Sequence, residues 1–271
     1  MTTSPASDAS GRSATQSATQ AELKRARALH GKKEREATGR FLVQGHKMVS
    51  ELLASAFKPQ AVFASAAAAG ALAGAAKAAQ VQVHMVPDHE LQRLGTFDNG
   101  NEVVAVVQHP PEASDAPPTG SELVLALDGV HDPGNLGTVL RIADRFGVRR
   151  VVCGLGCVDV FNPKCVQATM GSILRVAVRY DDLAGRLGAW RSAGVNVYLA
   201  DGGGTNVFAT PLARPAVLVL GSESHGLSQQ VLALEAERIA IPQFGGAESL
   251  NVATAAAALC MEFARRIPQG D

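Results

Sequence analysis

Polar side chains that could do chemistry gather in three short segments, each of which follows an apolar run. Asn135 and Arg141 lie in "DPGNLGTVLRIADRFG", Glu223 in "LVLGSESHGL", and Ser249 and Asn251 in "IPQFGGAESLNVATA". Amide, carboxylate, hydroxyl and guanidinium groups close to glycines can orient a substrate and stabilise charge that develops on an oxygen. Each segment alone is a weak signal, but three together predict one binding site.

Other glycine-containing motifs fail at defining positions. In "GLGCVD", Asp159 stands where a dinucleotide-binding loop needs its third glycine, and no Walker lysine follows any glycine-rich loop. Ser224 lacks the glycine two residues earlier that a hydrolase elbow requires, because that position is Ser222. A dehydrogenase or an α/β hydrolase therefore remains only a minor alternative.

Composition limits the cellular setting. The chain is 46% hydrophobic and 18% charged, which suits folded domains. The start of the chain lacks the basic and apolar stretches of a signal peptide, and no run is apolar enough for a membrane span. We expect a cytoplasmic protein without a membrane partner. No CxxC pair or zinc-like spacing exists, so we expect neither a metal nor a disulfide among Cys153, Cys157, Cys165 and Cys260.

The three segments lie within a repeating pattern of elements over residues 122–271. Each repeat predicts an apolar strand, a polar or glycine-rich loop, and an amphipathic helix. The strands are "LVLALDGV", "RRVVCG", "RVAVRY", "VNVYLA", "AVLVLG" and "RIAIP". Continuous apolar strands predict a mostly parallel sheet covered by helices on both faces. Ligands bind at the carboxyl ends of such strands, where all three segments lie. Asn135 is expected to cap the helix that Gly147 ends.

The proline-rich segment at 108–121, "QHPPEASDAPPTGS", predicts a linker. Before it, residues 21–107 alternate helical and strand-like runs and form a small α/β domain. Residues 1–20 are expected to be a disordered tail. The sequence therefore predicts a tail, a small α/β domain, a linker and a larger α/β domain at 122–271.

Charge is distributed unevenly, although the net charge is zero. Residues 21–60 hold nine Lys or Arg against four Glu, whereas the remainder from residue 61 holds fifteen against twenty Asp or Glu. A basic arm on an acidic body is expected of a protein that contacts an RNA phosphate backbone, and a solvated helix face is the alternative. The candidate RNA contacts are Lys24, Arg27, Lys32, Lys33, Arg35 and Arg141.

The three segments resemble the three ordered motifs of the SpoU (TrmH-like) branch of the SPOUT RNA methyltransferases. Asn135 and Arg141 have the family's N-x5-R spacing, and Glu223, Ser249 and Asn251 stand at matching positions over residues 122–267. Residues 29–53 resemble, more loosely, the family's small ribosomal-protein-like substrate domain, with Gln44 where relatives often carry Glu.

The resemblance implies a SPOUT domain whose chain forms a deep trefoil knot, a homodimer, and S-adenosylmethionine as cofactor. It also implies catalytic roles for Asn135, Arg141, Glu223, Ser249 and Asn251. The cofactor is expected against Leu220, Gly221, Ser222, Ile241, Pro242, Leu250 and Asn251.

The implied reaction is methyl transfer to a ribose 2′-hydroxyl, in ribosomal RNA first and in transfer RNA as the alternative. A guanidinium is effectively always protonated, so we expect Arg141 to stabilise charge or bind phosphate rather than act as a base. An RNA-binding protein that has lost catalysis is a further alternative.

Overall fold

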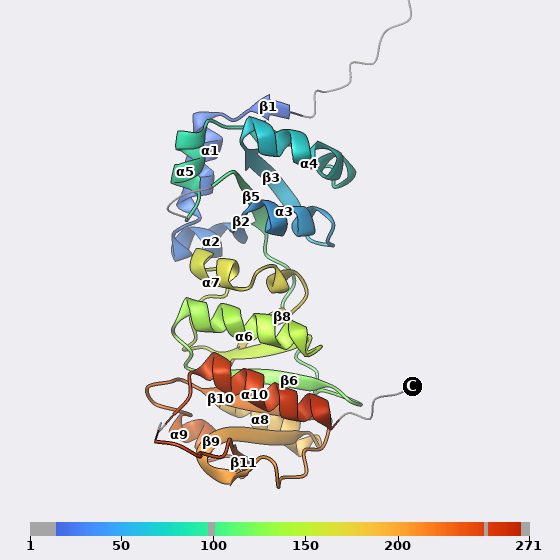
Figure 1. Ribbon diagram of the computed structural model, residues 1–271, viewed down its shortest axis with the longest axis vertical. Helices are drawn as coiled ribbons and strands as arrows, with labels where there is room; N and C mark the ends of the chain where they lie inside the picture. Colours follow the sequence, from blue (N-terminus) through green and yellow to red (C-terminus); the bar gives the residue numbers. More distant parts are fainter. Residues whose placement is uncertain (1–14, 97–100, 247–248, 267–271) are drawn as a thin grey trace, which may run out of the picture. The chain divides into compact units, whose positions relative to one another are not determined.

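The computed structural model describes residues 15–96, 101–246 and 249–266 (Figure 1). Residues 1–14 of the tail predicted at 1–20 lie outside the described residues, but Thr15–Ser17 form a strand and Gln20 begins a helix, so the prediction of disorder is wrong for that part. The chain divides into two compact units: residues up to Leu29 together with Val43–Gln108, and His30–Leu42 together with the chain from His109 onward. Each unit is described by itself below.

The first unit is built on a five-stranded sheet with the order β1-β4-β3-β5-β2. The strands of this sheet are β1 (Thr15–Ser17), β2 (Arg40–Gln44), β3 (Pro59–Ala64), β4 (Val83–Met85) and β5 (Val103–Gln108). By its contacts, the first part of β2, up to Leu42, is grouped with the second unit. Its helices are α1 (Gln20–Ala28), α3 (His46–Leu53), α4 (Ala66–Ala78) and α5 (Asp88–Leu94). Strand β3 runs parallel to β4 and antiparallel to β5. The predicted small α/β fold is confirmed.

The second unit contains a parallel six-stranded sheet with the order β11-β9-β10-β6-β7-β8. Its strands are β6 (Leu123–Asp128), β7 (Arg150–Gly154), β8 (Ala177–Asp181), β9 (Asn196–Asn206), β10 (Ala216–Gly221) and β11 (Glu237–Ala240). Each of the six predicted strands is therefore present.

Helices cover both faces of this sheet. They are α6 (Pro133–Arg145), α7 (Pro163–Ala168), α8 (Leu183–Ser192), α9 (Gln229–Leu232) and α10 (Val252–Arg265), and a 3-10 turn, η1, spans Ser172–Leu174. Helices α6 and α10 pack side by side (Figure 1). On the α8 side, Leu187 and Trp190 belong to one buried cluster with Val152 of β7 and Val217 and Val219 of β10. Because both faces are covered, the central strands need continuous apolar sequence. Helix α2 (Lys32–Thr38) also belongs to this unit by its contacts.

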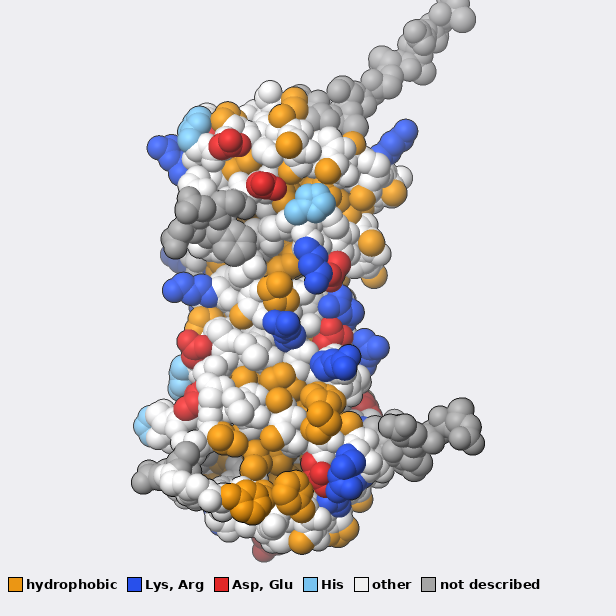
Figure 2. All heavy atoms as spheres, in the orientation of Figure 1, with side chains coloured by type: hydrophobic (Ala, Val, Ile, Leu, Met, Phe, Trp, Pro, Cys, Tyr) orange, Lys and Arg blue, Asp and Glu red, His pale blue; other side chains and the backbone are white. Residues whose placement is uncertain are grey.

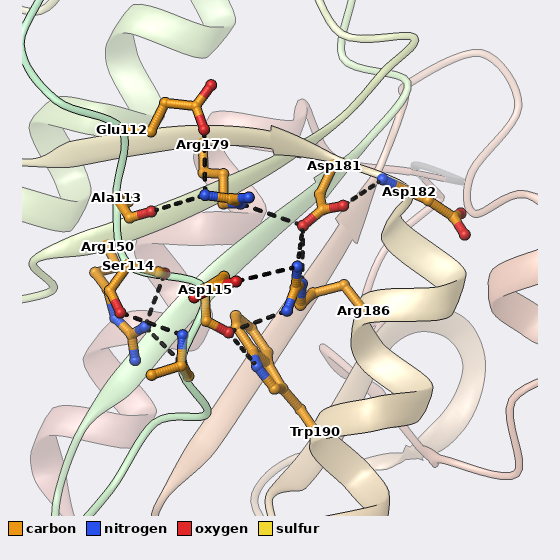
Figure 3. Close-up of polar contacts among 11 residues, drawn as sticks. Glu112, Ala113, Ser114, Asp115, Arg150, Arg179, Asp181, Asp182, Arg186 and Trp190 are labelled. Carbon is orange, nitrogen blue, oxygen red and sulfur yellow. Dashed lines mark hydrogen bonds and ion pairs between the residues drawn. The ribbon is translucent and has the colours of Figure 1, made fainter.

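Residues 109–122 form no helix or strand, whereas Gln108, which the predicted linker 108–121 included, ends β5. This segment belongs to the second unit and is hydrogen-bonded to its other residues (Figure 3). The Asp115 carbonyl accepts hydrogen bonds from Trp190 Nε1 at 3.0 Å and Arg186 Nη1 at 3.1 Å. Arg150 Nη1 donates to the Ala116 carbonyl at 2.7 Å. These donors satisfy linker carbonyls that no secondary structure pairs, so this segment is fixed rather than a free tether.

No helix among the described residues is both long and apolar enough to cross a bilayer. No group of three or more His, Cys, Asp or Glu in the described ranges could hold a metal ion.

Candidate active site

Three polar side chains meet at the carboxyl end of the second sheet, although they come from segments far apart in the sequence. The side-chain amide of Asn135 donates a hydrogen bond to the Glu223 carboxylate. Asn251 Nδ2 in turn donates to Asn135 Oδ1 at 3.0 Å. Strands β6 and β10 are neighbours, with Gly221 paired to Asp128, so their following loops start side by side. Each of the three sequence segments thus contributes one member to a continuous hydrogen-bonded cluster.

The local structure corrects the predicted role of Asn135 as a helix cap. Asp132 is the N-cap of α6, Pro133 occupies the first turn, and Asp132 Oδ1 accepts the Asn135 N–H at 2.8 Å. An Asp directly before Pro is a helix-start signal that sequence reasoning missed here. Because Asp132 caps the start of α6, the Asn135 side chain is free to form hydrogen bonds with Glu223 and Asn251.

Asn251 caps helix α10 and completes the cluster at the same time. Its Oδ1 accepts from the backbone N–H groups of Ala253 at 2.9 Å and Thr254 at 3.3 Å. The cap fixes the amide orientation, and Nδ2 then points to Asn135. The rigid start of a 14-residue helix therefore positions one end of the cluster.

Glu223 sits in a tight turn after β10. Ser222 and Gly226 exchange two backbone hydrogen bonds, of 3.0 and 2.9 Å, and Gly226 has a φ of +64°. A Cβ on Gly221 would lie 2.2 Å from the Gly226 carbonyl carbon. Gly221 was expected to let the backbone approach a ligand, but the close approach that the structure shows is to this turn. Ser228 N–H donates to Asp128 Oδ2 at 2.7 Å and ties the turn's far side to β6.

Arg141 and Ser249 stand outside this hydrogen-bonded cluster. Both are exposed, and neither side chain has a hydrogen bond or an ion pair with any described residue. Arg141 lies six residues beyond Asn135 on α6, about 9 Å further along the axis. Glu223 therefore holds Asn135 rather than Arg141, and the guanidinium is left available to a ligand.

Two of the segments expected to hold the cofactor adjoin the cluster in sequence, because Ser222 precedes Glu223 and Leu250 precedes Asn251. Leu220 and Ser222 are buried at the end of β10, and Ile241 and Pro242 follow β11. The backbone groups of Ile241 and Leu250 make no hydrogen bond to any other described residue. Unpaired N–H and C=O groups at a strand end fit the donor and acceptor edge of an adenine.

Cysteine thiols lie beneath this end of the sheet. Cys157 Sγ donates to the Leu127 carbonyl at 3.2 Å, and Cys153 and Cys165 are fully buried. A hydrogen bond with Cys157, together with burial, raises the pKa of Cys153 well above its ordinary value. Burial likewise raises the pKa of Cys165. Both are neutral packing groups at physiological pH rather than nucleophiles.

Most of the basic residues predicted to contact RNA remain accessible. Lys24 on α1 and Lys32 and Lys33 on α2 are exposed. Arg27 is different, because its guanidinium is paired with Glu90 and its side chain is only 31% exposed. Lys24 and Lys33 have no ion pair among the described residues, whereas the ammonium of Lys32 lies 3.6 Å from Glu36 Oε1 on the surface of α2.

Arg35 is not a phosphate contact, so its prediction was wrong. Its side chain is 3% exposed, and Nε and Nη2 both donate to Asp159 Oδ2, at 3.0 and 2.7 Å. A buried guanidinium held by a carboxylate and by the His30 carbonyl has a structural role. Helical spacing alone could not reveal this, because Asp159 lies 124 residues away.

Comparisons with known proteins agree with this geometry. Residues 122–261 match the SpoU rRNA Methylase family, and residues 20–105 match the MRM3-like substrate binding domain. The chain is 32% identical to the Bacillus subtilis 23S rRNA (guanosine(2553)-2′-O)-methyltransferase RlmP over 85% of this chain and 91% of that protein.

Two solved structures are similar over most of their length. An AdoMet-bound rRNA methyltransferase from Sinorhizobium meliloti shares 29% identity and a TM-score of 0.83, covering 94% of this chain and 99% of that one. The SpoU methyltransferase AviRb from Streptomyces viridochromogenes, in complex with AdoMet, shares 27% identity and a TM-score of 0.81, covering 93% and 100%. The predicted α/β fold with a mostly parallel sheet and an N-terminal substrate-binding domain is confirmed, and so is the enzyme class. This chain belongs to the SpoU rRNA methylase family.

Proposed function

We propose that this protein methylates a ribose 2′-hydroxyl of ribosomal RNA with S-adenosylmethionine as the methyl donor. The observation that carries the proposal is the cluster of Asn135, Glu223 and Asn251 at the carboxyl end of the parallel sheet. Family membership supplies the enzyme class, and the similar RlmP is named for 2′-O-methylation of 23S rRNA.

The cofactor is held, in this proposal, by the backbone at the ends of β10 and β11. Leu220, Gly221 and Ser222 form one wall, and Ile241, Pro242, Leu250 and Asn251 form the other. Both structural relatives described above are complexes with AdoMet. When bound, S-adenosylmethionine supplies a methyl group already activated on a sulfonium. The chain's own task is therefore to place the hydroxyl and to manage its proton.

Asn135 is the positioning residue for the target ribose. Glu223 accepts from its amide nitrogen and Asn251 donates to its amide oxygen, so the amide cannot rotate. A fixed amide holds a ribose hydroxyl in line with the donor at lower entropic cost than a mobile one does. Ser249 is exposed just before the start of α10 and, in this proposal, forms part of the site that binds the ribose.

Arg141 acts by its charge. The side chain has no partner among the described residues, so it can bind the RNA phosphate or stabilise an alkoxide. A guanidinium group carries a positive charge in proteins and is a poor proton acceptor, so another group takes the proton of the hydroxyl.

The larger organisation follows the family. We propose residues 21–107 as the RNA-binding domain, 108–121 as the linker, and 122–271 as the methyltransferase domain with a deep trefoil knot. The match of residues 20–105 to a substrate binding domain supports this division. Met261, 60% exposed on α10, is an apolar side chain that a homodimer interface would cover. The proposed location, beside ribosomal RNA, is the cytoplasm.

The direct test uses purified protein, unmodified ribosomal RNA and labelled S-adenosylmethionine. Ribose methylation is then mapped by primer-extension stops at low nucleotide concentration. A single stop that disappears with Arg141→Ala is expected. If the label enters bulk transfer RNA instead, transfer RNA is the substrate rather than ribosomal RNA. If the label enters neither RNA, the proposed activity is wrong.

A further inference from the structure

The loop between β11 and α10 carries the most exposed large apolar side chain in the described part of the chain. Phe244 is 91% exposed, and Leu250 in the same loop is 47% exposed. Phe244 makes no ring contact with any described aromatic residue. Water solvates an aromatic face poorly, so an exposed ring in the loop that leads to Asn251 points to a partner outside the folded unit.

The backbone around Phe244 is held in place. Gln243 Nε2 donates to the Gly245 carbonyl at 2.8 Å, which closes a turn around Phe244. The far end of the loop is fixed by Asn251, which caps α10 and bonds to Asn135. The ring therefore projects from a loop with one end in the proposed catalytic cluster.

The proposed reaction requires a contact to the nucleotide in addition to those with the ribose. Every nucleotide carries the same ribose hydroxyl, so contacts to the ribose alone do not fix the rest of the nucleotide. Proteins that bind unpaired RNA bases stack them on aromatic side chains.

We propose that Phe244 stacks on a nucleobase of the RNA, at or beside the nucleotide that is methylated. This inference rests on the proposed function, since it assumes that RNA enters the cluster of Asn135, Glu223 and Asn251. Phe244 is then a positioning residue, and it holds the base while Asn135 holds the ribose. Stacking is tolerant of base identity, so Phe244 contributes affinity rather than sequence choice.

The test compares Phe244→Ala and Phe244→Trp with the wild type. Steady-state methylation of ribosomal RNA gives kcat and KM, and equilibrium binding of the same RNA without cofactor gives a separate affinity. Calorimetry with S-adenosylmethionine, light scattering for mass, and thermal unfolding report the other functions of the loop. Phe208→Ala is the control, because Phe208 is 58% exposed and its carbonyl bonds to Arg266, at the opposite end of α10.

Loss of stacking predicts a fall in RNA affinity and in kcat/KM of about 5- to 150-fold for Phe244→Ala. Phe244→Trp should restore most of the loss, because the larger ring still stacks. Cofactor affinity, mass and unfolding temperature should match the wild type, and Phe208→Ala should behave as the wild type does.

Three results would overturn the stacking proposal: unchanged RNA affinity and kcat/KM, weakened cofactor binding, or a change of mass. The second would assign the ring to the cofactor, and the third to a second copy of the chain. If the wild type binds RNA but transfers no methyl group, the proposed function is wrong. The binding assay would still test whether Phe244 stacks on a nucleobase.

Discussion

At the scale of single residues, Asn251 joins a structural task to a chemical one. Its oxygen caps α10, and its nitrogen orients Asn135. The two tasks can be separated, because aspartate is as good an N-cap but has no amide nitrogen to donate.

Asn251→Asp is expected to keep the unfolding temperature and to lower methyl transfer about 10- to 100-fold through a misplaced Asn135. Asn251→Ala should lose the cap as well, which costs about 0.5–2 kcal/mol of the free energy of unfolding. Thermal unfolding and initial rates measured on the same preparations check both. An Asn251→Asp enzyme with the wild-type rate would remove Asn251 from the positioning cluster.

Arg141 is the second residue whose role can be isolated. Arg141→Lys keeps the charge but loses the planar fork that binds phosphate or an oxyanion through two parallel hydrogen bonds. We expect the rate to fall roughly 100-fold while the shape of the pH–rate profile is unchanged. If rate and profile both matched the wild type, no role that needs the guanidinium fork would survive.

At the scale of elements, the turn after β10 depends on close backbone packing. A Cβ at position 221 would meet the Gly226 carbonyl carbon at 2.2 Å, and backbone cannot yield as a flexible side chain does. Glu223 lies in this turn and accepts a hydrogen bond from Asn135, so a change in the turn would displace Asn135.

Gly221→Ala is expected to destabilise the protein by about 1–3 kcal/mol through overpacking and to reduce methyl transfer. Gly156→Ala is the matched control, because a Cβ there would meet nothing within 4 Å. Denaturant unfolding of the two variants provides the comparison. Equal stability for both would show that the turn can relax without cost.

The linker is a second element whose state the structure defines. Arg186 donates to the Asp115 carbonyl and pairs with Asp181 at 2.7 Å (Figure 3). Burial acts to raise the pKa of Asp181, but hydrogen bonds from Arg186 and Arg179 outweigh it and hold that pKa below its ordinary value. The Asp181 carboxylate thus stays ionised at neutral pH and keeps Arg186 in place.

Arg186→Ala should therefore speed amide hydrogen exchange at residues 113–116, because a carbonyl clamp is lost. Arg191→Ala is the control, since Arg191 is 45% exposed and pairs only loosely with Glu235, at 3.8 Å. Exchange followed by mass spectrometry distinguishes them. Unchanged protection in Arg186→Ala would mean that Trp190 and Arg150 suffice.

At the scale of the whole molecule, basic residues near the start of the chain offset an acidic remainder. In Figure 2, blue Lys and Arg side chains line parts of the visible face. Exposed lysines at positions 24, 32 and 33 can neutralise phosphates, whereas Arg35 cannot, because Asp159 holds it.

Replacing Lys24, Lys32 and Lys33 with Gln should weaken RNA binding and flatten its dependence on salt. Each lost phosphate contact lowers the slope of log K against log salt by about 0.7–0.9. Arg35→Ala should leave that slope unchanged and lower the free energy of unfolding by about 3–5 kcal/mol, because Asp159 would lose its partner. Binding titrations at several salt concentrations decide this, and a slope unchanged by the three Lys→Gln replacements would place the RNA contact elsewhere.

The sequence by itself determined the strands, the order of the domains and the site segments. Six apolar runs became the six parallel strands, because continuous burial on both faces requires continuous apolar sequence. Polar residues after those runs were predicted to meet, because parallel strands end at one edge of the sheet. Asp132 could also have been found, since an Asp before Pro marks a helix start.

Only the tertiary structure decided which side chains bond to each other. Asn135 meets Glu223 across 88 residues and Asn251 across 116, and Arg35 meets Asp159 across 124. Periodicity reports which face of an element is buried, but it carries no information on partners from other elements. For the same reason, the sequence predicted Arg35 as an RNA contact, although its guanidinium is paired with Asp159. It also predicted a proline-rich linker without indicating that other side chains donate hydrogen bonds to the linker carbonyls.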